Sequence, residues 1–385
     1  MIGLYVHIPF CTVRCSYCDF YLVPARGRDL AIYAQAVKAE MVSAGSEGGG
    51  EVAGLAAPSG AADTLHFGGG TPSLLGGASL ALLIAAARDA FRLDPQAEVA
   101  LEANPEDLTA GRVHELRNAG ITRLTVGVQS LDDRLLRLMR RPHDAAQALR
   151  AVETSRRAGF RSLAADLILG LPDQAADDAL AGLAWLSDRG VDHLSLYLLE
   201  VHARTRLGRA VALGRCATPP DDAMAELYER ACDLLTGRGF EHYEISNFAR
   251  PGHRSRHNLK YWTDQEYLGF GPSAHSYVGG GRWSNPPDLS AYLACGGRGL
   301  RRRFDRQPRL QRGMEALLAG MRLLEGVDLE ALRRRYDGRL PGPGDPAVAL
   351  LRDAGLVTTE CGRLRLTRRG RLVSNEVLER LMPIS

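Results

Sequence analysis

The chain has 385 residues, of which 45% are hydrophobic and 24% are charged, and its formal net charge is only +3. This composition is typical of a globular protein with room for one large domain and one small one. It excludes a transmembrane helix, because no run of about 18 uncharged apolar residues occurs. The N-terminus shows no secretory signal pattern, so we expect a cytoplasmic protein.

The basic residues do not indicate contact with nucleic acid. Only two of the 48 are lysines, Lys38 and Lys260, and the rest are arginines. The arginine runs at 301–303, 333–335 and 368–369 are dispersed and lack interleaved aromatic residues. We interpret them as solvated surface and expect no nucleic-acid partner.

Up to about residue 200, the hydrophobic pattern predicts strands that alternate with helices. The predicted strands cover residues 3–8, 63–67, 98–103, 123–128, 162–168 and 193–199, and the helical segments 30–42, 80–91, 109–119, 132–158 and 177–189. Residues 43–62 are mostly Gly, Ala, Ser and Pro, which favours a flexible surface insertion. Six such units predict an α/β fold with a parallel sheet, either a partial (β/α)6 barrel or an open sheet.

Beyond residue 200 the alternation ends. A helix is predicted over 221–238, a strand over 243–248 and a basic linker over 298–309. Four helices follow, at 311–324, 329–336, 347–354 and 369–381, with a hairpin formed by 356–359 and 363–366. This pattern indicates a small winged-helix-like C-terminal domain. We therefore predict three parts: a barrel at 1–205, its extension at 206–297, and the linker with the C-terminal domain at 298–385.

Three of the seven cysteines, Cys11, Cys15 and Cys18, follow the first predicted strand at C-x3-C-x2-C spacing. Three thiolates in one short loop can bind three irons of a [4Fe-4S] cluster and leave the fourth iron open. Zinc is the rival interpretation; it would need a fourth ligand, such as His7. No second C-x-x-C pair occurs, which favours the iron–sulfur cluster. The isolated cysteines Cys216, Cys232, Cys295 and Cys361 are interpreted as incidental thiols of a reducing compartment.

Other polar or flexible residues stand where the predicted strands end. They are the glycines 68–70, Glu102, Gln129 and Asp166. In a β/α barrel, and also in an open parallel sheet, ligands bind at the carboxyl ends of the strands. The glycine triplet does not fit G-x-G-x-x-G, so no dinucleotide fingerprint is present.

The chain resembles the radical S-adenosylmethionine proteins, and within them the HemN/HemW group of coproporphyrinogen III dehydrogenases and heme chaperones. The matching motifs lie at 5–11, 68–72, 102–105, 127–130 and 166–172, and the resemblance extends into the C-terminal domain. It implies a radical-SAM barrel in which Cys11, Cys15 and Cys18 hold the cluster. It further implies contacts with S-adenosylmethionine from Tyr5, Tyr17, Gly69, Gly70, Thr71, Glu102, Gln129, Arg141 and Asp166. Without the resemblance, Tyr5 and Tyr17 are equally compatible with core packing, and Glu102 with a salt bridge.

Two departures favour the heme-chaperone members of the group. The dehydrogenases resemble C-x3-C-x2-C-x-C, and this chain has Phe20 at the place of their last cysteine. Their N-terminal extension is also missing, since Tyr5 is nearly the first residue.

A further sequence match also favours the heme-chaperone members of the group. The segment 257–262 fits the H-N-x-x-Y-W motif of the chaperones, which implies a heme pocket with His257, Tyr261 and Trp262. The alternative is an aromatic core cluster that contains one histidine. His242, His253 and His275 are further candidate heme ligands.

The resemblance leaves two functions. The first is a heme chaperone that binds heme, a [4Fe-4S] cluster and S-adenosylmethionine, and delivers heme to apo-cytochromes or respiratory enzymes. The second is an oxygen-independent coproporphyrinogen III dehydrogenase, which decarboxylates propionates by radical chemistry. We prefer the chaperone, and therefore leave open whether the protein is an enzyme. The expected partners include a low-potential electron donor, a second copy of the chain, and a membrane surface in peripheral contact.

Overall fold

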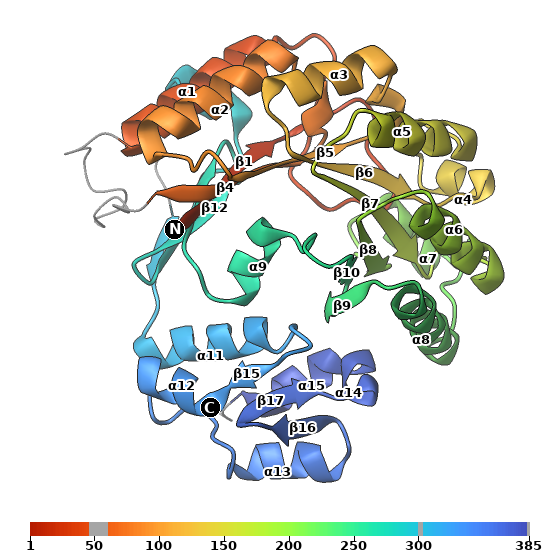
Figure 1. Ribbon diagram of the computed structural model, residues 1–385, viewed down its shortest axis with the longest axis vertical. Coiled ribbons are helices and arrows are strands. Elements are labelled where there is room, and N and C mark those ends of the chain that lie inside the picture. The colour runs from red at the N-terminus through yellow and green to blue at the C-terminus, as the bar shows by residue number, and fades with distance from the viewer. Residues whose placement is uncertain (46–60, 299–302, 383–385) are drawn as a thin grey trace.

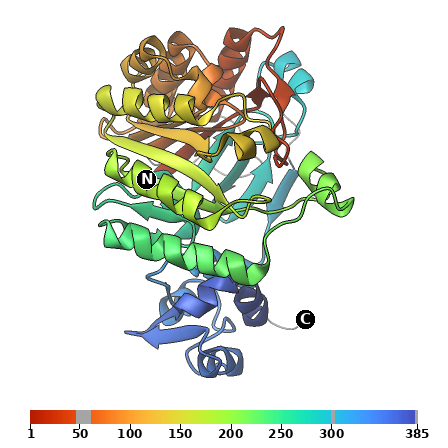
Figure 2. The same cartoon turned by 90° about the vertical axis from the view of Figure 1, so that its right-hand side faces the viewer.

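Figure 1 shows the computed structural model, which describes residues 1–45, 61–298 and 303–382. The residues after about 307 form a separate body at one end of the molecule in both Figure 1 and Figure 2. Most of the predicted insertion at 43–62 lies outside the described residues. Its first residues extend a helix, α1 (Leu30–Gly45), and its last residue begins a strand, β4 (Ala62–Gly69). Among the described residues, no helix is long and apolar enough to cross a membrane.

The six predicted strands are confirmed as neighbours in one parallel sheet. In spatial and chain order they are β1 (Ile2–Ile8), β4, β5 (Glu98–Ala103), β6 (Arg123–Gln129), β7 (Ser162–Leu169) and β8 (His193–Leu198). Most of their residues are buried, as is usual for strands covered on both faces. The parallel register brings all six carboxyl ends to the same edge of the sheet.

Helices cover the outer face of these strands (Figures 1 and 2). They are α1, α2 (Gly77–Phe91), α3 (Ala110–Ala119), α4 (Asp133–Leu138), α5 (Ala145–Arg157), α6 (Ala176–Asp188) and α8 (Asp221–Gly237). Local chemistry sets their ends. The side chains of Thr109, Asp132 and Asp144 accept hydrogen bonds from the first turns of α3, α4 and α5. Gly120 ends α3 at φ +106°, a conformation that favours glycine.

The sheet is larger than predicted and contains 12 strands. Beyond β1 it continues with β11 (Tyr267–Phe270), β12 (His275–Val278), β13 (Gly281–Ser284) and β14 (Arg303–Arg306). The predicted linker at 298–309 was therefore wrong in part, because β14 pairs with β13. The order of the described strands runs from β14 to β9 (Glu241–Glu244) without closing, as in a partial barrel.

The single strand predicted at 243–248 was wrong. The segment forms two strands, β9 and β10 (Asn247–Ala249), and β10 pairs antiparallel with β8. The cause is the buried Glu244 carboxylate, which accepts hydrogen bonds from the Ser246 backbone N–H and from the Asn247 side chain. These bonds favour a turn at 245–246 over a continuous ladder.

Five short elements also belong to the large unit. They are the parallel pair β2 (Phe10–Cys11) and β3 (Val23–Pro24), which brackets the cysteine loop, and the helices α7 (Arg206–Ala212), α9 (Arg256–Trp262) and α10 (Leu289–Ala294). Two 3₁₀ turns, η1 (Pro72–Leu74) and η2 (Pro105–Asp107), follow β4 and β5.

The C-terminal unit has its own hydrophobic core, which includes the fully buried Leu317, Leu351, Leu364 and Val377. Its elements are α11 (Arg309–Gly320), β15 (Val327–Asp328), α12 (Leu329–Arg335), α13 (Pro346–Asp353), β16 (Val357–Glu360), β17 (Arg363–Leu366), α14 (Arg368–Leu372) and α15 (Ser374–Leu381). The predicted hairpin is confirmed. The third strand, β15, was missed, and the single last helix is divided at Val373.

Candidate functional site

A cavity of about 520 Å³ opens at the carboxyl ends of the parallel strands, within the range of roughly 300–1,000 Å³ that is usual for ligand pockets. Of the residues predicted to bind the cluster or S-adenosylmethionine, the following line it: Cys11, Cys15, Tyr17, Cys18, Gly69, Gly70, Thr71, Glu102, Gln129, Arg141 and Asp166. They come from strand ends and adjoining loops that are far apart in the sequence. The fold thus gathers nearly the whole predicted set around one space.

The cysteine loop is fixed from several sides. The Ser16 hydroxyl donates to the Leu138 carbonyl over 2.9 Å, and the Leu207 amide donates to the Ser16 carbonyl over 2.9 Å. Burial raises the pKa of the Cys11 thiol to about 11 and also raises that of Cys18. Buried thiols of this kind need a bound cation to persist as thiolates at neutral pH.

The glycine turn after β4 requires residues without a side chain. Gly69 has φ +111°, and a Cβ there would lie 2.6 Å from the His7 ring. A Cβ on Gly70 would lie 2.6 Å from the Phe10 carbonyl oxygen and 3.1 Å from the Cys11 sulfur. The backbone therefore passes close to the cysteine loop, an approach that only glycine allows at these two positions.

Arg141 approaches the cysteine loop from the opposite side of the cavity. Its Nη1 lies 3.6 Å from the Cys15 sulfur, while Nη2 donates to Asn104 Oδ1 over 2.6 Å and to the Gly127 carbonyl over 3.0 Å. Its Nε is buried without a hydrogen-bond partner. Asn104 was quoted in a motif but was not predicted as a site residue. Its amide also donates to Thr71 Oγ1 over 3.4 Å, so it links Arg141 to the glycine turn.

Gln129 is the last residue of β6, whereas Asp166 lies within β7 and not at its end, where it was predicted. Burial raises the pKa of the Asp166 carboxyl to about 7, although a hydrogen bond with Ser195 lowers it in part. One oxygen, Oδ1, is buried without a partner. Gln129 has φ +64°, which is rare for a residue other than glycine and marks a locally strained backbone.

A histidine that the sequence prediction missed lies behind Glu102. His66 Nε2 is 3.0 Å from Glu102 Oε1, and its Nδ1 is buried without a partner. The parallel register of β4 and β5 creates this contact, so only a correct strand alignment could have revealed it. Tyr5 stacks on His66 with ring centroids 5.9 Å apart, and it does not line the cavity.

The cavity suits the ligands that the cysteine loop implies. Three sulfurs face one end, and beyond them lie the unpartnered Arg141 Nε, the unpartnered Asp166 Oδ1 and the Glu102 carboxylate. These groups can bind a carboxylate, an amine and sugar hydroxyls, which are the polar groups of S-adenosylmethionine. No group of three or more His, Cys, Asp or Glu residues within 1–45, 61–298 and 303–382 is arranged to hold a single metal ion.

The segment 257–262 forms α9 and lies in the core. His257 is 1% exposed, and both ring nitrogens have partners at 2.8 Å, Thr64 Oγ1 at Nδ1 and Tyr261 Oη at Nε2. The guanidinium of Arg322, in the C-terminal unit, lies 4.5 Å from the centre of the Trp262 ring. In this arrangement the motif braces β4 and the contact between the two units. A heme role for His257 stays a prediction, and it would require one of these hydrogen bonds to be exchanged for a bond to iron.

The other predicted heme ligands are scattered. His242 is stacked on Phe248 with ring centroids 4.1 Å apart, and burial lowers its pKa to about 4. His253 lies 4.0 Å from Asp192, and His275 is exposed on β12. None of the three lines the cavity that contains the cysteines.

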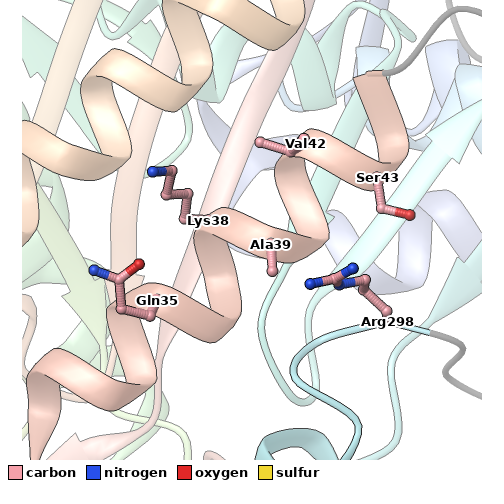
Figure 3. A pocket seen from close by; sticks show the side chains of 6 residues that line it. All are labelled: Gln35, Lys38, Ala39, Val42, Ser43 and Arg298. Atoms are coloured by element: carbon pink, nitrogen blue, oxygen red, sulfur yellow. The ribbon is translucent and has the colours of Figure 1, made fainter.

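Figure 3 shows a second, more open hollow of about 410 Å³ on the outer face of α1. It is lined by Gln35, Lys38, Ala39, Val42, Ser43 and Arg298. This hollow offers two cations and two neutral polar groups but no acid, thiol or imidazole. The chemistry of the chain is therefore concentrated in the cavity with the cysteine loop.

Comparisons with known proteins find matches for both units of the chain. The Radical SAM superfamily profile matches residues 5–186, and the HemN C-terminal domain profile matches residues 307–373. The solved structure of coproporphyrinogen III oxidase (HemN) from Escherichia coli has a TM-score of 0.80, with 24% identity, and covers 99% of this chain and 89% of that one. At this identity the structural match establishes the fold.

Relatives in sequence are more specific. A Mycobacterium tuberculosis protein named heme chaperone HemW is 38% identical over 385 residues, which cover 99% of this chain and 94% of the relative. A Bacillus subtilis protein of the same name is 32% identical over 382 residues, or 98% of each chain. The chain therefore belongs to the radical S-adenosylmethionine superfamily, within the family of proteins named heme chaperone HemW.

Proposed function

We propose that this protein is a heme chaperone, which binds heme and passes it to apo-cytochromes or respiratory enzymes. The observation that carries the proposal is the identity of 38% with a protein named heme chaperone HemW, over 99% of this chain. Phe20 also supports the proposal, because the dehydrogenases resemble a motif with a cysteine at this position. The Phe20 side chain is 63% exposed at the rim of the cavity, and it offers an apolar surface in place of a thiol.

Each residue predicted to bind the cluster or S-adenosylmethionine has a defined task in this proposal. Cys11, Cys15 and Cys18 hold a [4Fe-4S] cluster, and Gly69, Gly70 and Thr71 approach the methionyl group of S-adenosylmethionine. The remaining contacts come from Tyr5, Tyr17, Glu102, Gln129, Arg141 and Asp166. Tyr5 contributes only indirectly, through its stacking on His66 behind Glu102.

The positions of the charged groups support this assignment. Arg141 Nε is a free donor for the ligand carboxylate. Glu102, whose Oε1 lies 3.0 Å from His66 Nε2, can accept from ribose hydroxyls. Asp166 Oδ1 accepts from an amine or a hydroxyl when the carboxyl is ionised. When bound, the cluster and S-adenosylmethionine supply one-electron chemistry fed by a low-potential donor.

The second candidate is the oxygen-independent coproporphyrinogen III dehydrogenase. The same cluster and S-adenosylmethionine residues would serve it, and this overlap is the observation that favours it. The two candidates differ in what the bound tetrapyrrole undergoes. The chaperone releases heme unchanged, whereas the dehydrogenase removes two propionate carboxyl groups as CO₂.

One experiment separates the candidates. The cluster is reconstituted without oxygen, and one sample receives hemin while another receives coproporphyrinogen III, S-adenosylmethionine and a reductant. We expect stoichiometric hemin binding and no protoporphyrinogen IX. Conversion of coproporphyrinogen III would refute the chaperone, and lack of hemin binding would refute it as well. Transfer of the bound heme to a heme-depleted respiratory cytochrome then tests delivery, and gel filtration tests for a homodimer.

A further inference from the structure

The mouth of the cavity is unusually apolar for an exposed surface. Val13 and Phe20 come from the cysteine loop, and Tyr197 and Leu198 come from the end of β8. All four line the cavity, and their exposed fractions lie between 36% and 63%. Isolated exposed apolar residues are common, but a group around one opening marks a binding surface. We call these four residues the apolar rim.

Hydrogen bonds fix both segments that form the apolar rim, the cysteine loop and the chain at the end of β8. Asp19, in the cysteine loop, pairs through both carboxylate oxygens with Arg204, in the segment after β8. The Leu207 amide adds the bond to the Ser16 carbonyl, and the Leu199 amide donates to the Leu169 carbonyl over 2.8 Å. The apolar rim is therefore a built surface, with its side chains exposed in the structure as folded.

An imidazole stands at the same mouth. His202 lines the cavity with 45% of its side chain exposed, and its Nε2 lies 3.6 Å from Glu200 Oε2. An exposed imidazole can donate the electron pair of one ring nitrogen to iron. His257 differs in both respects, since it is buried and both of its ring nitrogens are already hydrogen-bonded.

Two arginines lie on the segments that form the mouth of the cavity. Arg14 is exposed in the cysteine loop, next to Cys15. The Arg204 side chain is 79% exposed, although it pairs with Asp19. An exposed guanidinium can bind a second carboxylate through its remaining N–H groups. The mouth thus combines an apolar surface and an imidazole, and two cations lie on the segments that form it.

The inner part of the cavity is already assigned. The three sulfurs, Arg141 and Asp166 surround the space for the cluster and S-adenosylmethionine. A second, larger ligand must therefore lie across the mouth and not below it. Heme matches the mouth in each respect, because it is a flat apolar ring with an iron that accepts imidazole and with two propionates at one edge.

We infer that heme binds across the mouth of the cavity, with His202 as an iron ligand, Phe20 and Leu198 against the ring, and Arg14 and Arg204 at the propionates. This inference rests on the proposed function, since it requires that the protein binds heme. It places the heme next to the S-adenosylmethionine site, and outside the core cluster that contains His257.

Titrations of the cluster-loaded full chain with hemin and with iron-free protoporphyrin IX test the inference. His202→Ala should weaken hemin binding by roughly tenfold, or about 1.4 kcal/mol, and alter the Soret band, and added imidazole should restore the band. Binding of protoporphyrin IX should not change, because it has no iron to ligate. Phe20→Glu should weaken the binding of both hemin and protoporphyrin IX. His114→Ala, at an exposed histidine on α3, is the matched control and should change neither.

The outcomes are distinguishable. If the wild type binds no hemin, the proposed function fails. If the wild type binds hemin and His202→Ala binds it with the same affinity and spectrum, the heme lies elsewhere and the inference is wrong while the proposed function stands. Unchanged binding of both ligands by Phe20→Glu would likewise overturn the inference.

Discussion

Cys15 illustrates how a single residue of the site acts. Its sulfur lies 3.6 Å from Nη1 of the Arg141 guanidinium. The same guanidinium is tied to Asn104 and to the Gly127 carbonyl. The charge of Arg141 is therefore held in place before any ligand arrives.

Replacing Cys15 with alanine should abolish the cluster, because two thiolates leave a second iron without a protein ligand. We expect the iron content and the broad thiolate-to-iron absorption of the reconstituted protein to be lost. Cys361→Ala removes an exposed cysteine of the C-terminal hairpin and should leave both unchanged. Full iron content in Cys15→Ala, or zinc in place of iron in the wild type, would contradict the assignment.

The raised pKa of Asp166 predicts a pH effect on the stability of the cluster-free protein. The carboxyl titrates at about 7 in the folded chain but near 3.9 when unfolded. Between these values the folded state binds a proton that the unfolded state lacks. The free energy of unfolding should therefore fall as pH rises through this window, by up to about 1.4 kcal/mol per unit.

Asp166→Asn should remove this contribution, and urea unfolding at several pH values measures it. Asp89→Asn, at an exposed residue on α2, is the control and should retain the slope of the wild type. If the free energy of unfolding depends on pH in the same way for Asp166→Asn and the wild type, the pKa of the Asp166 carboxyl is not raised in the folded chain.

At the scale of elements, the site depends on how the backbone leaves each strand. After β4, Gly69 and Gly70 let the chain turn against His7 and the cysteine loop. After β6, the strained Gln129 turns the chain toward α4. Short bends at strand ends thus aim several loops at the same cavity, while the strands behind them stay regular.

Gly69→Ala should damage the glycine turn, because its φ of +111° and the His7 ring 2.6 Å away both oppose a Cβ. We expect a loss of about 1–3 kcal/mol in the free energy of unfolding and weaker binding of S-adenosylmethionine by calorimetry. Gly111→Ala, at an exposed helical glycine with open space around it, is the control. It should stabilise the protein by about 0.5–1 kcal/mol. Equal stability of the two variants would contradict this account of the turn.

At the scale of the whole molecule, two separate cores meet at a polar contact. Glu244, which is fully buried in the large unit, accepts from Arg322 of the C-terminal unit over 3.2 Å. Burial raises the pKa of Glu244, and Arg322 opposes that rise. Arg322 also covers the Trp262 ring of α9. One arginine thus couples the C-terminal unit to the helix that braces β4.

Arg322→Ala should lower the free energy of unfolding by about 2 kcal/mol, because it leaves the Glu244 carboxylate buried with fewer partners. Denaturant unfolding should show the C-terminal unit separating earlier from the cluster-binding unit. Arg339→Ala breaks an exposed pair with Asp337 inside the C-terminal unit and should have little effect. If both variants behave alike, the contact between the units is not held by Arg322.

The sequence alone determined the alternation of strands and helices, the hairpin, the cysteine loop and the glycine turn. These features depend on local spacing and on residues with special backbone freedom, so they are visible within short windows. The six central strands were predicted for this reason, and nearly all the residues predicted to bind the cluster or S-adenosylmethionine line the cavity. Two features were not predicted. The division of the strand at Glu244 depends on the hydrogen bonds of a buried side chain. The strand β14 forms because it pairs with β13, which no local pattern in its own sequence indicates.

Only the tertiary structure decided which predicted residues face the same space. It places His66 against Glu102 through the register of neighbouring strands, and it buries His257 between Thr64 and Tyr261. It also gathers the apolar rim around His202, from segments almost 200 residues apart in the chain. Contacts at such separations depend on the pairing and twist of the sheet, and no local pattern encodes them.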